Sequence, residues 1–321
     1  MAVLLMLFGC TDLTEFDHSL KTGINIFHAP DLTVVNTIEN ISGARSLCVV
    51  PDCFIVATTE GTVIRFDLES HQQTGSFTIG SPSPSGYFEI EYSPAENTVY
   101  IIGAFGQIVE LTVPDMEFLD EFIICEAPVD IEIASMKPYF YVAGANSFKI
   151  YEVSKANHLA GRYSTLWYSP TCMAIDQSQD TILVGTLDKT FMVSTGPGLM
   201  SRRMLDYFPM ILAVQAISDD TNLCAVFDYS IPTIATIHSY FPPEGGPCWT
   251  GTAPIEGEIH FICTDVFGDY AYVFSYLGDN MSRLVSYNCE DYSIESQVDL
   301  EGYPLDLDLS PGGTLLVLTT E

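Results

Sequence analysis

The sequence predicts an all-β fold, a seven-bladed β-propeller with four-stranded blades, and three observations carry this prediction. A strongly β-forming segment recurs about every 41–47 residues, which is the period of four-stranded propeller repeats. Glycine or proline interrupts the chain roughly every 8–12 residues, and no long stripe of apolar residues has helical spacing. The incomplete repeats at the two ends of the chain add up to one complete repeat, which would close a ring.

The recurrent segment is the second strand of each expected blade, and it marks the repeat most clearly. Each example is a short apolar run, rich in β-branched and aromatic residues, that lies between polar turns. The first six examples are followed by two further strands, whereas the chain stops after the seventh. In chain order the segments begin at Phe54, Tyr100, Tyr141, Ile182, Cys224, Tyr272 and Leu315.

The two ends of the chain supply the two halves of the last blade. Gly23–Glu39 reads as two alternating strands around a Pro30-Asp31 turn, and no first or second strand precedes it. Tyr303–Glu321 reads as a first and second strand around a Ser-Pro-Gly-Gly turn. A two-stranded hairpin is marginal alone and leaves an open edge, so we expect these segments to pair. One propeller domain then spans residues 23–321.

These repeats resemble those of the YVTN-type seven-bladed β-propeller family. Pro304–Gly313 (PLDLDLSPGG) is similar to the family's first strand and turn, and Tyr141–Gly144 (YVAG) is similar to its tetrapeptide strand. Ile24–His28 (INIFH) and Val34–Ile38 (VVNTI) are similar to the third and fourth strands. The resemblance covers about residues 22–321 and implies the propeller architecture. It implies no single activity, because the family includes surface-layer, periplasmic and enzyme-related proteins.

The first ten residues form an apolar run that ends in Leu-Phe-Gly-Cys. This ending resembles a bacterial lipoprotein signal, in which the cysteine is lipidated and becomes the new N-terminus. We interpret residues 1–10 as the remnant of such a signal, Cys10 as the lipidation site and residues 11–22 as a linker. A cell-envelope location, lipid-anchored or secreted, follows. Because the basic n-region is absent and the apolar run is short, an ordinary buried first strand is the alternative.

The charge balance is strongly acidic, with 11 Lys and Arg against 42 Asp and Glu and a formal net charge of −31. Such a surface repels phosphate backbones and anionic head groups, which argues against nucleic-acid binding and against membrane contact other than through a lipid anchor. Of the nine cysteines, the eight besides Cys10 lack zinc-ligand spacing. Most of them lie in apolar strands, and Cys248 and Cys289 are the better candidates for a disulfide.

Three of the expected first strands carry acids at i, i+2 spacing. The first strand of a propeller blade lines the central channel, and residues two apart lie on one side of a strand. We therefore expect six carboxylates at the channel, with His260 at the corresponding place in the sixth blade: Glu89, Glu91, Asp130, Glu132, Asp306 and Asp308. Small or neutral residues correspond to them elsewhere: Ser46 and Cys48, Cys172 and Ala174, Val214 and Ala216. Packed carboxylates recruit a cation such as Ca²⁺ or raise one another's pKa, and a wet channel that tolerates them is the alternative.

Aromatic residues stand in loops that lead into the first strands, and these loops share one face of the ring. They are Tyr87, Trp167, Tyr207 and Tyr303. Aromatic rings above an acidic channel suit a cationic, amine-bearing or sugar-like ligand. The alternative is that the rings fill gaps between blades.

Signals for catalysis are weak, because the sequence has no H-E-x-x-H, G-x-S-x-G, Walker or dinucleotide-binding motif. We therefore expect a monomeric, non-enzymatic binding or interaction protein whose partner is a protein or a small ligand. The alternative is a metal-dependent lactonase or hydrolase, in which His260 and the channel acids would meet around an ion. A subunit of a quinone-dependent dehydrogenase has no discriminating motif here.

Overall fold

The computed structural model describes residues 21–79, 87–103, 106–175, 179–186, 190–196, 200, 202–205, 210–218, 221–228, 231–238, 248–265 and 267–320. Only the backbone is described for residues 87–88, 190, 202–205, 210–218, 221–228, 231–238 and 248–254. Two of the residues singled out above, Cys10 and Tyr207, lie outside the described residues. Within the described residues, no helix is both long and apolar enough to cross a membrane.

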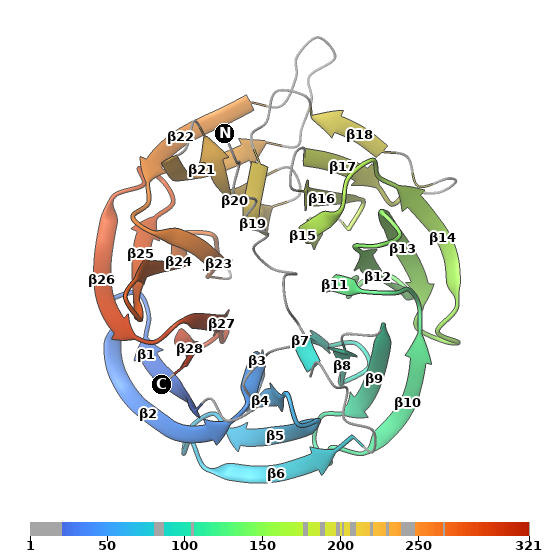
Figure 1. The fold of residues 1–321 in the computed structure, drawn as a ribbon, viewed down its shortest axis with the longest axis horizontal. Coiled ribbons are helices and arrows are strands. Elements are labelled where there is room, and N and C mark those ends of the chain that lie inside the picture. Colours follow the sequence, from blue (N-terminus) through green and yellow to red (C-terminus); the bar gives the residue numbers. More distant parts are fainter. Residues whose placement is uncertain are drawn as a thin grey trace.

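The chain forms a ring of four-stranded antiparallel sheets around a central axis (Figure 1). This confirms the prediction of an all-β propeller with four-stranded blades. In each sheet the first strand lies nearest the axis, and the fourth strand runs along the circumference (Figure 1). Seven such sheets are formed by the described strands. Each segment that the sequence marks as a second strand coincides with one of the strands β4, β8, β12, β16, β20, β24 and β28.

The strands follow one another in each sheet from the axis outward. Strands β3 to β6 are Ala44–Val50, Cys53–Thr58, Thr62–Asp67 and Gln73–Thr78. Strands β7 to β10 are Tyr87–Ser93, Thr98–Gly103, Gln107–Thr112 and Phe118–Ile123. Strands β11 to β14 are Pro128–Ile133, Tyr139–Gly144, Lys149–Ser154 and Ala160–Thr165. Strands β15 to β18 are Pro170–Ile175, Thr181–Thr186, Thr190–Ser194 and Arg202–Leu205.

The remaining strands complete the ring. Strands β19 to β22 are Met210–Ser218, Thr221–Asp228, Ile231–His238 and Cys248–Pro254. Strands β23 to β26 are Glu258–Thr264, Tyr270–Gly278, Met281–Asn288 and Ile294–Glu301. The last sheet has the order β27, β28, β1 and β2, with bounds Pro304–Leu309, Thr314–Thr320, Lys21–His28 and Thr33–Ser42.

This last sheet joins the two ends of the chain. Strand β1 pairs antiparallel with β28, from Thr22 opposite Thr320 to His28 opposite Thr314. The hairpin between β27 and β28 turns at Ser310, whose Oγ accepts a hydrogen bond from the Thr314 N–H at 2.8 Å. Strand β1 begins two residues before the position that the sequence indicates.

The hydrophobic core lies between neighbouring sheets. Consecutive residues of the second strand point in opposite directions, so Phe54 packs toward the sheet that contains β1 and Ile55 packs toward the sheet that contains β8. Both side chains are fully buried. Burial on both faces explains why the second strands are continuous apolar runs, and hence why they mark the repeat so clearly in the sequence.

Candidate functional site

Six carboxyl side chains gather around the ring axis, and we call them the axial acids. They come in pairs from the inner strands β7, β11 and β27, which lie nearest the axis in Figure 1. After burial, repulsion from Asp130 and Asp306 contributes to the raised pKa of Glu89, so carboxyls of all three pairs are within electrostatic reach of one another. The axial acids are Glu89, Glu91, Asp130, Glu132, Asp306 and Asp308.

Two of the axial acids connect the last sheet to the first sheet of the chain. Asp306 Oδ2 accepts hydrogen bonds from Ser46 Oγ and from the Leu47 N–H, both at 2.7 Å. Asp308 Oδ2 accepts one from the Val49 N–H at 2.6 Å. The second oxygen of each carboxyl accepts the N–H of the residue that follows it in β27. Each aspartate therefore ties its own strand to β3 of the neighbouring sheet.

The pair on β11 makes the same connection to β15. Asp130 Oδ2 accepts a hydrogen bond from the Met173 N–H at 2.6 Å, and the backbone of Ile175 donates to Glu132. The pair on β7 differs, because neither Glu89 nor Glu91 has a hydrogen bond to any described residue. Four of the axial acids therefore stabilise contacts between neighbouring sheets, whereas the pair on β7 makes no such hydrogen bond within the described part of the chain.

Burial raises the pKa of every axial acid, because a carboxylate at the axis loses hydrating water. The pKa of Asp306 rises to about 6, and those of Asp130 and Asp308 rise to about 7; hydrogen bonds from backbone N–H groups limit these rises. The pKa values of the three glutamates rise well above their usual range, through burial and then through repulsion from the neighbouring carboxyls. The axial acids therefore ionise at higher pH than ordinary carboxyl groups do.

The axial acids are not arranged as ligands of one metal ion. Among the described residues, no group of three or more His, Cys, Asp or Glu side chains has the geometry to hold a metal. The hydrogen-bonded oxygens of Asp130, Asp306 and Asp308 point toward N–H groups of neighbouring strands. These carboxylates satisfy backbone donors, which is a sufficient reason for their presence at the axis.

A β-bulge near the start of every inner strand changes the alignment expected from the sequence. In β27 the register shifts between Pro304 and Asp306, and in β23 it shifts between Ile259 and Phe261. A bulge inserts one residue and redirects its side chain. His260 is therefore the bulge residue, and Phe261 and Cys263 are the counterparts of Asp306 and Asp308 in this sheet. The expected equivalence of His260 to the axial acids is wrong.

The same shift corrects the alignment of β19. Its register changes between Ile211 and Ala213. Ala213 and Gln215 therefore correspond to the axial acids, instead of Val214 and Ala216. The positions expected in β3 and β15 are correct. The register shift comes just before Ser46 and Cys172, as it does before Asp306, so Ser46 and Cys48, and likewise Cys172 and Ala174, occupy the positions of Asp306 and Asp308.

Two bulge residues, Arg45 and His260, lie close together at one end of the axis beside Tyr303. The Tyr303 hydroxyl lies 3.4 Å from His260 Nδ1, and the two rings meet edge to face with centroids 4.8 Å apart. The ring of Tyr276 lies 4.9 Å from that of Tyr303. Burial, followed by the nearby Arg45 guanidinium, lowers the pKa of His260 to about 4, so this imidazole is neutral at physiological pH.

The residues that meet at this end of the axis are Arg45, Glu258, His260, Tyr276 and Tyr303. From the sequence, His260 and Tyr303 were expected at the channel, whereas the other three were missed. Glu258 Oε1 lies 3.7 Å from His260 Nε2. A lone basic residue in the otherwise uncharged strand β3 was the available signal for Arg45. Arg45 is far from the other four residues in the chain, so its position beside them depends on the pairing of β1 with β28.

The loops that lead into the inner strands define one face of the ring, which we call the loop face. Here Trp167 and Phe148 are neighbours, because the Leu166 N–H donates to the Phe148 carbonyl at 2.6 Å. The Trp167 side chain is 61% exposed and that of Phe148 is 44% exposed. One edge of Trp167 contacts Phe191, with centroids 6.5 Å apart. Strand β7 begins at Tyr87, but the side chain of this residue lies outside the description.

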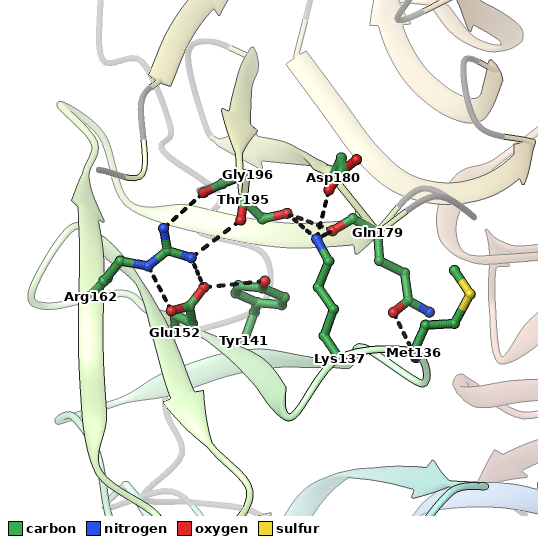
Figure 2. A network of polar contacts seen from close by, with 9 residues as sticks. All are labelled: Met136, Lys137, Tyr141, Glu152, Arg162, Gln179, Asp180, Thr195 and Gly196. Carbon is green, nitrogen blue, oxygen red and sulfur yellow. Dashed lines mark hydrogen bonds and ion pairs between the residues drawn. The ribbon is translucent and has the colours of Figure 1, made fainter. Parts of the chain in front are cut away.

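A second polar network lies away from the axis, between the sheets β11–β14 and β15–β18 (Figure 2). Glu152 is 3% exposed and forms two hydrogen-bonded contacts with Arg162, one of them from Nε to Oε1 at 2.7 Å. The same guanidinium donates to the Gly196 carbonyl at 2.9 Å and to the Thr195 carbonyl at 3.2 Å. Arg162 therefore neutralises a buried charge and connects two sheets at once.

The cysteines do not form the disulfide that the sequence suggests. Cys289 is a free thiol, as are Cys48, Cys53, Cys125, Cys172 and Cys263. Its partner candidate, Cys248, is described only as part of the backbone of β22. Burial raises the pKa of Cys289 to about 12, so this thiol is protonated and unreactive at neutral pH.

Comparisons with known proteins support the fold. No family model matches the chain, and no curated protein matches it. The β-propeller domain of Cps50 (Swd1) from Myceliophteria thermophila aligns with a TM-score of 0.70 and 11% identity, over 93% of this chain and 100% of that one. U3-55K aligns with a TM-score of 0.69 and 9% identity, over 92% and 98%.

A third solved structure is also similar to this chain. Hydrazine synthase from Kuenenia stuttgartiensis aligns with a TM-score of 0.66 and 13% identity, over 84% of this chain and 90% of that chain. At these identities the likeness shows the propeller fold alone. The narrower resemblance to YVTN-type repeats has no matching family model and stays a prediction.

Proposed function

We propose that this chain is a non-enzymatic interaction protein that binds a basic protein partner through the loop face around Trp167. The observation that carries the proposal is the exposure of Trp167 and Phe148, on loops that the Leu166–Phe148 backbone hydrogen bond joins, with Trp167 also packed on Phe191 of the next sheet. Exposed tryptophan on a rigid scaffold is typical of the centre of a protein interface. Loops on propellers and other rigid scaffolds commonly carry binding residues.

The charge of the molecule indicates the chemistry of the partner. A net charge of −31 attracts cationic surfaces and repels acidic ones, so association with a basic partner is fast and specific. The axial acids add negative charge beneath the loop face whenever they ionise. A peptide that combines basic side chains with one aromatic or aliphatic anchor fits both features.

The architecture that we propose for this scaffold is a closed ring of seven blades, in which the N-terminal strands complete the last blade. The pairing of β1 with β28 and the hydrogen bonds of Asp306 and Asp308 to β3 support it. A closed ring, in which only short and protected sheet edges remain, holds its loops in fixed positions, which lowers the conformational cost of binding.

An array of basic peptides tests the proposed interface. Calorimetry then measures the affinity of each binding peptide for the wild-type protein, for Trp167→Ala and for Tyr163→Ala. Tyr163→Ala is the control, because Tyr163 is 56% exposed but lies on the outer strand β14, away from the loop face. We expect Trp167→Ala to weaken binding by about tenfold or more, as loss of an interface anchor does, and Tyr163→Ala to leave it unchanged. The proposal would be contradicted if no binding peptide in the array were weakened by Trp167→Ala relative to Tyr163→Ala.

The cell-envelope location is a separate part of the proposal, and it rests on the Leu-Phe-Gly-Cys ending at Cys10. If Cys10 is lipidated, cells supplied with labelled palmitate incorporate label into the wild-type chain and none into Cys10→Ala. Equal labelling, or no labelling of either chain, would remove the lipid anchor from the proposal.

A further inference from the structure

A strip of exposed apolar side chains crosses the outer wall of the ring along β10. The outer strands β6, β10 and β14 follow one another around the circumference (Figure 1). Phe77 near the end of β6 stacks on Phe118 at the start of β10, with ring centroids 6.4 Å apart. Leu119 follows, and Leu159 precedes β14; Phe118 and Leu119 are each 48% exposed and Leu159 is 65% exposed. We call Phe77, Phe118, Leu119 and Leu159 the rim patch.

A histidine fixes the position of one end of the rim patch. His158 precedes Leu159, and its Nδ1 lies 2.7 Å from Oδ2 of Asp120, the residue after Leu119. Its Nε2 lies 3.1 Å from Oε2 of Glu110 on β9, and its ring stacks on Phe122 with centroids 4.0 Å apart. These contacts join the turn before β14 to strands β9 and β10 of the neighbouring sheet, next in sequence to Leu119 and Leu159. The rim patch is therefore presented on a rigid base.

Carboxylates border the rim patch. Asp115, Glu117, Asp120 and Glu121 are all exposed at or beside β10. Within strands β5, β6, β9 and β10, Arg65 is the one basic residue, and its guanidinium donates to Thr74 and to the Val113 carbonyl. Exposed apolar side chains that are bordered by carboxylates mark an interaction site for a surface that combines apolar and basic groups.

We propose that the rim patch is a second docking surface, and that its occupant is a basic segment of a protein partner in which lysine or arginine alternates with large apolar residues. The apolar side chains of the segment cover the rim patch, and its cations meet the four bordering carboxylates. The N–H of Glu121 is not available for strand pairing, because it donates to Asp120 Oδ1 at 2.9 Å, so the proposed contact is through side chains. This surface does not depend on the loop face or on Trp167.

The test uses the full chain and two defined probes: a fluorescent peptide that alternates lysine and leucine, and the same peptide with glutamate for lysine. Anisotropy titrations compare the wild type with Leu119→Ser, Leu159→Ser and Ile294→Ser. Ile294 is the matched control, because it is 55% exposed on another outer strand, β26. We expect each of the first two substitutions to weaken binding of the lysine peptide by roughly tenfold and Ile294→Ser to leave it unchanged.

Further measurements separate this surface from its alternatives. Thermal melts verify that the variants fold, and hydrogen exchange is expected to slow at residues 118–121 when the lysine peptide is bound. Trp167→Ala should leave this binding intact, which distinguishes the rim patch from the loop face. Equal binding to all variants would show attraction to the net charge alone and would overturn the proposal. Absence of binding, or self-association of the chain that Leu119→Ser abolishes, would overturn it as well.

Discussion

At the scale of one residue, Glu152 shows how the ring accommodates a buried charge. Its carboxylate is 3% exposed, and its partners are the Arg162 guanidinium and the Tyr141 hydroxyl, which lies 3.4 Å away (Figure 2). Burial raises the pKa of Tyr141 to about 12, so this phenol stays protonated and can donate. Removing one partner of such a pair is costly, because the other charge stays buried without compensation.

Replacement of Arg162 by methionine is therefore expected to destabilise the protein by about 3–5 kcal/mol, as measured by chemical denaturation. The double variant Arg162→Met, Glu152→Gln should recover part of this loss, because no buried charge is left alone. Arg283→Met is the control: its partners Glu256 and Asp299 are exposed, so a loss below about 1 kcal/mol is expected. Equal losses for Arg162 and Arg283 would contradict this account of Glu152.

Some site residues could be predicted from the sequence and others could not, for identifiable reasons. The i, i+2 acids were predictable because strand geometry alone places both side chains on one side. Arg45 was missed and His260 was misaligned, because a bulge shifts the register by one residue and no residue type in these strands indicates the bulge. The hydrogen bonds of Asp306 to β3 were also missed, because they join residues about 260 positions apart in the chain.

At the scale of one element, β27 depends on its aspartates for contact with β3. Both oxygens of Asp308 accept backbone N–H donors, from Val49 at 2.6 Å and from Leu309 at 2.7 Å. An asparagine has one acceptor oxygen and places an NH₂ group toward a donor. The contact between β27 and β3 is therefore expected to weaken when one carboxylate oxygen of Asp308 is replaced by an NH₂ group.

Asp308→Asn is expected to lower the free energy of unfolding by about 1–3 kcal/mol, because one of two N–H groups loses its acceptor. Amide exchange at Val49 should become faster in the same variant. Glu91→Gln provides the comparison, since Glu91 makes no hydrogen bond to a described residue and its substitution removes only a repelled charge. A variant Asp308→Asn that matches Glu91→Gln in both measurements would show that the hydrogen bonds contribute nothing.

At the scale of the whole molecule, the four-stranded repeat was predictable because it needs only local information. Second strands buried on both faces give apolar runs such as Tyr100–Gly103, and the turns between them carry glycine, proline and asparagine. The identity of a partner is a different kind of property. It resides in a few exposed side chains, Trp167 and Leu119 among them, whose exposure depends on how the sheets pack.

The axial acids also give the whole molecule a pH dependence, and its sign follows from their raised pKa values. Such an acid binds more protons in the folded state than in the unfolded state, so stability falls as pH rises toward and through the folded pKa. His260 acts in the opposite direction, but only below about pH 6.5, because its pKa is lowered to about 4. Between pH 6.5 and 8 the axial acids dominate, with pKa values of about 6 to 7 for the aspartates.

We therefore expect the melting temperature to fall between pH 6.5 and pH 8 by at least about 2 °C, which corresponds to roughly 1 kcal/mol in a chain of this size. Calorimetric scans at about 1 M salt should show the same fall, because that ionic strength screens exposed charges and not buried ones. The double variant Glu89→Gln, Glu91→Gln should show a smaller fall, since two raised carboxyls are gone and no described hydrogen bond is lost. A melting temperature that rises over this range would mean that the axial acids are already ionised in the folded ring at pH 6.5, and that their hydrogen bonds to β3 and β15 outweigh their burial.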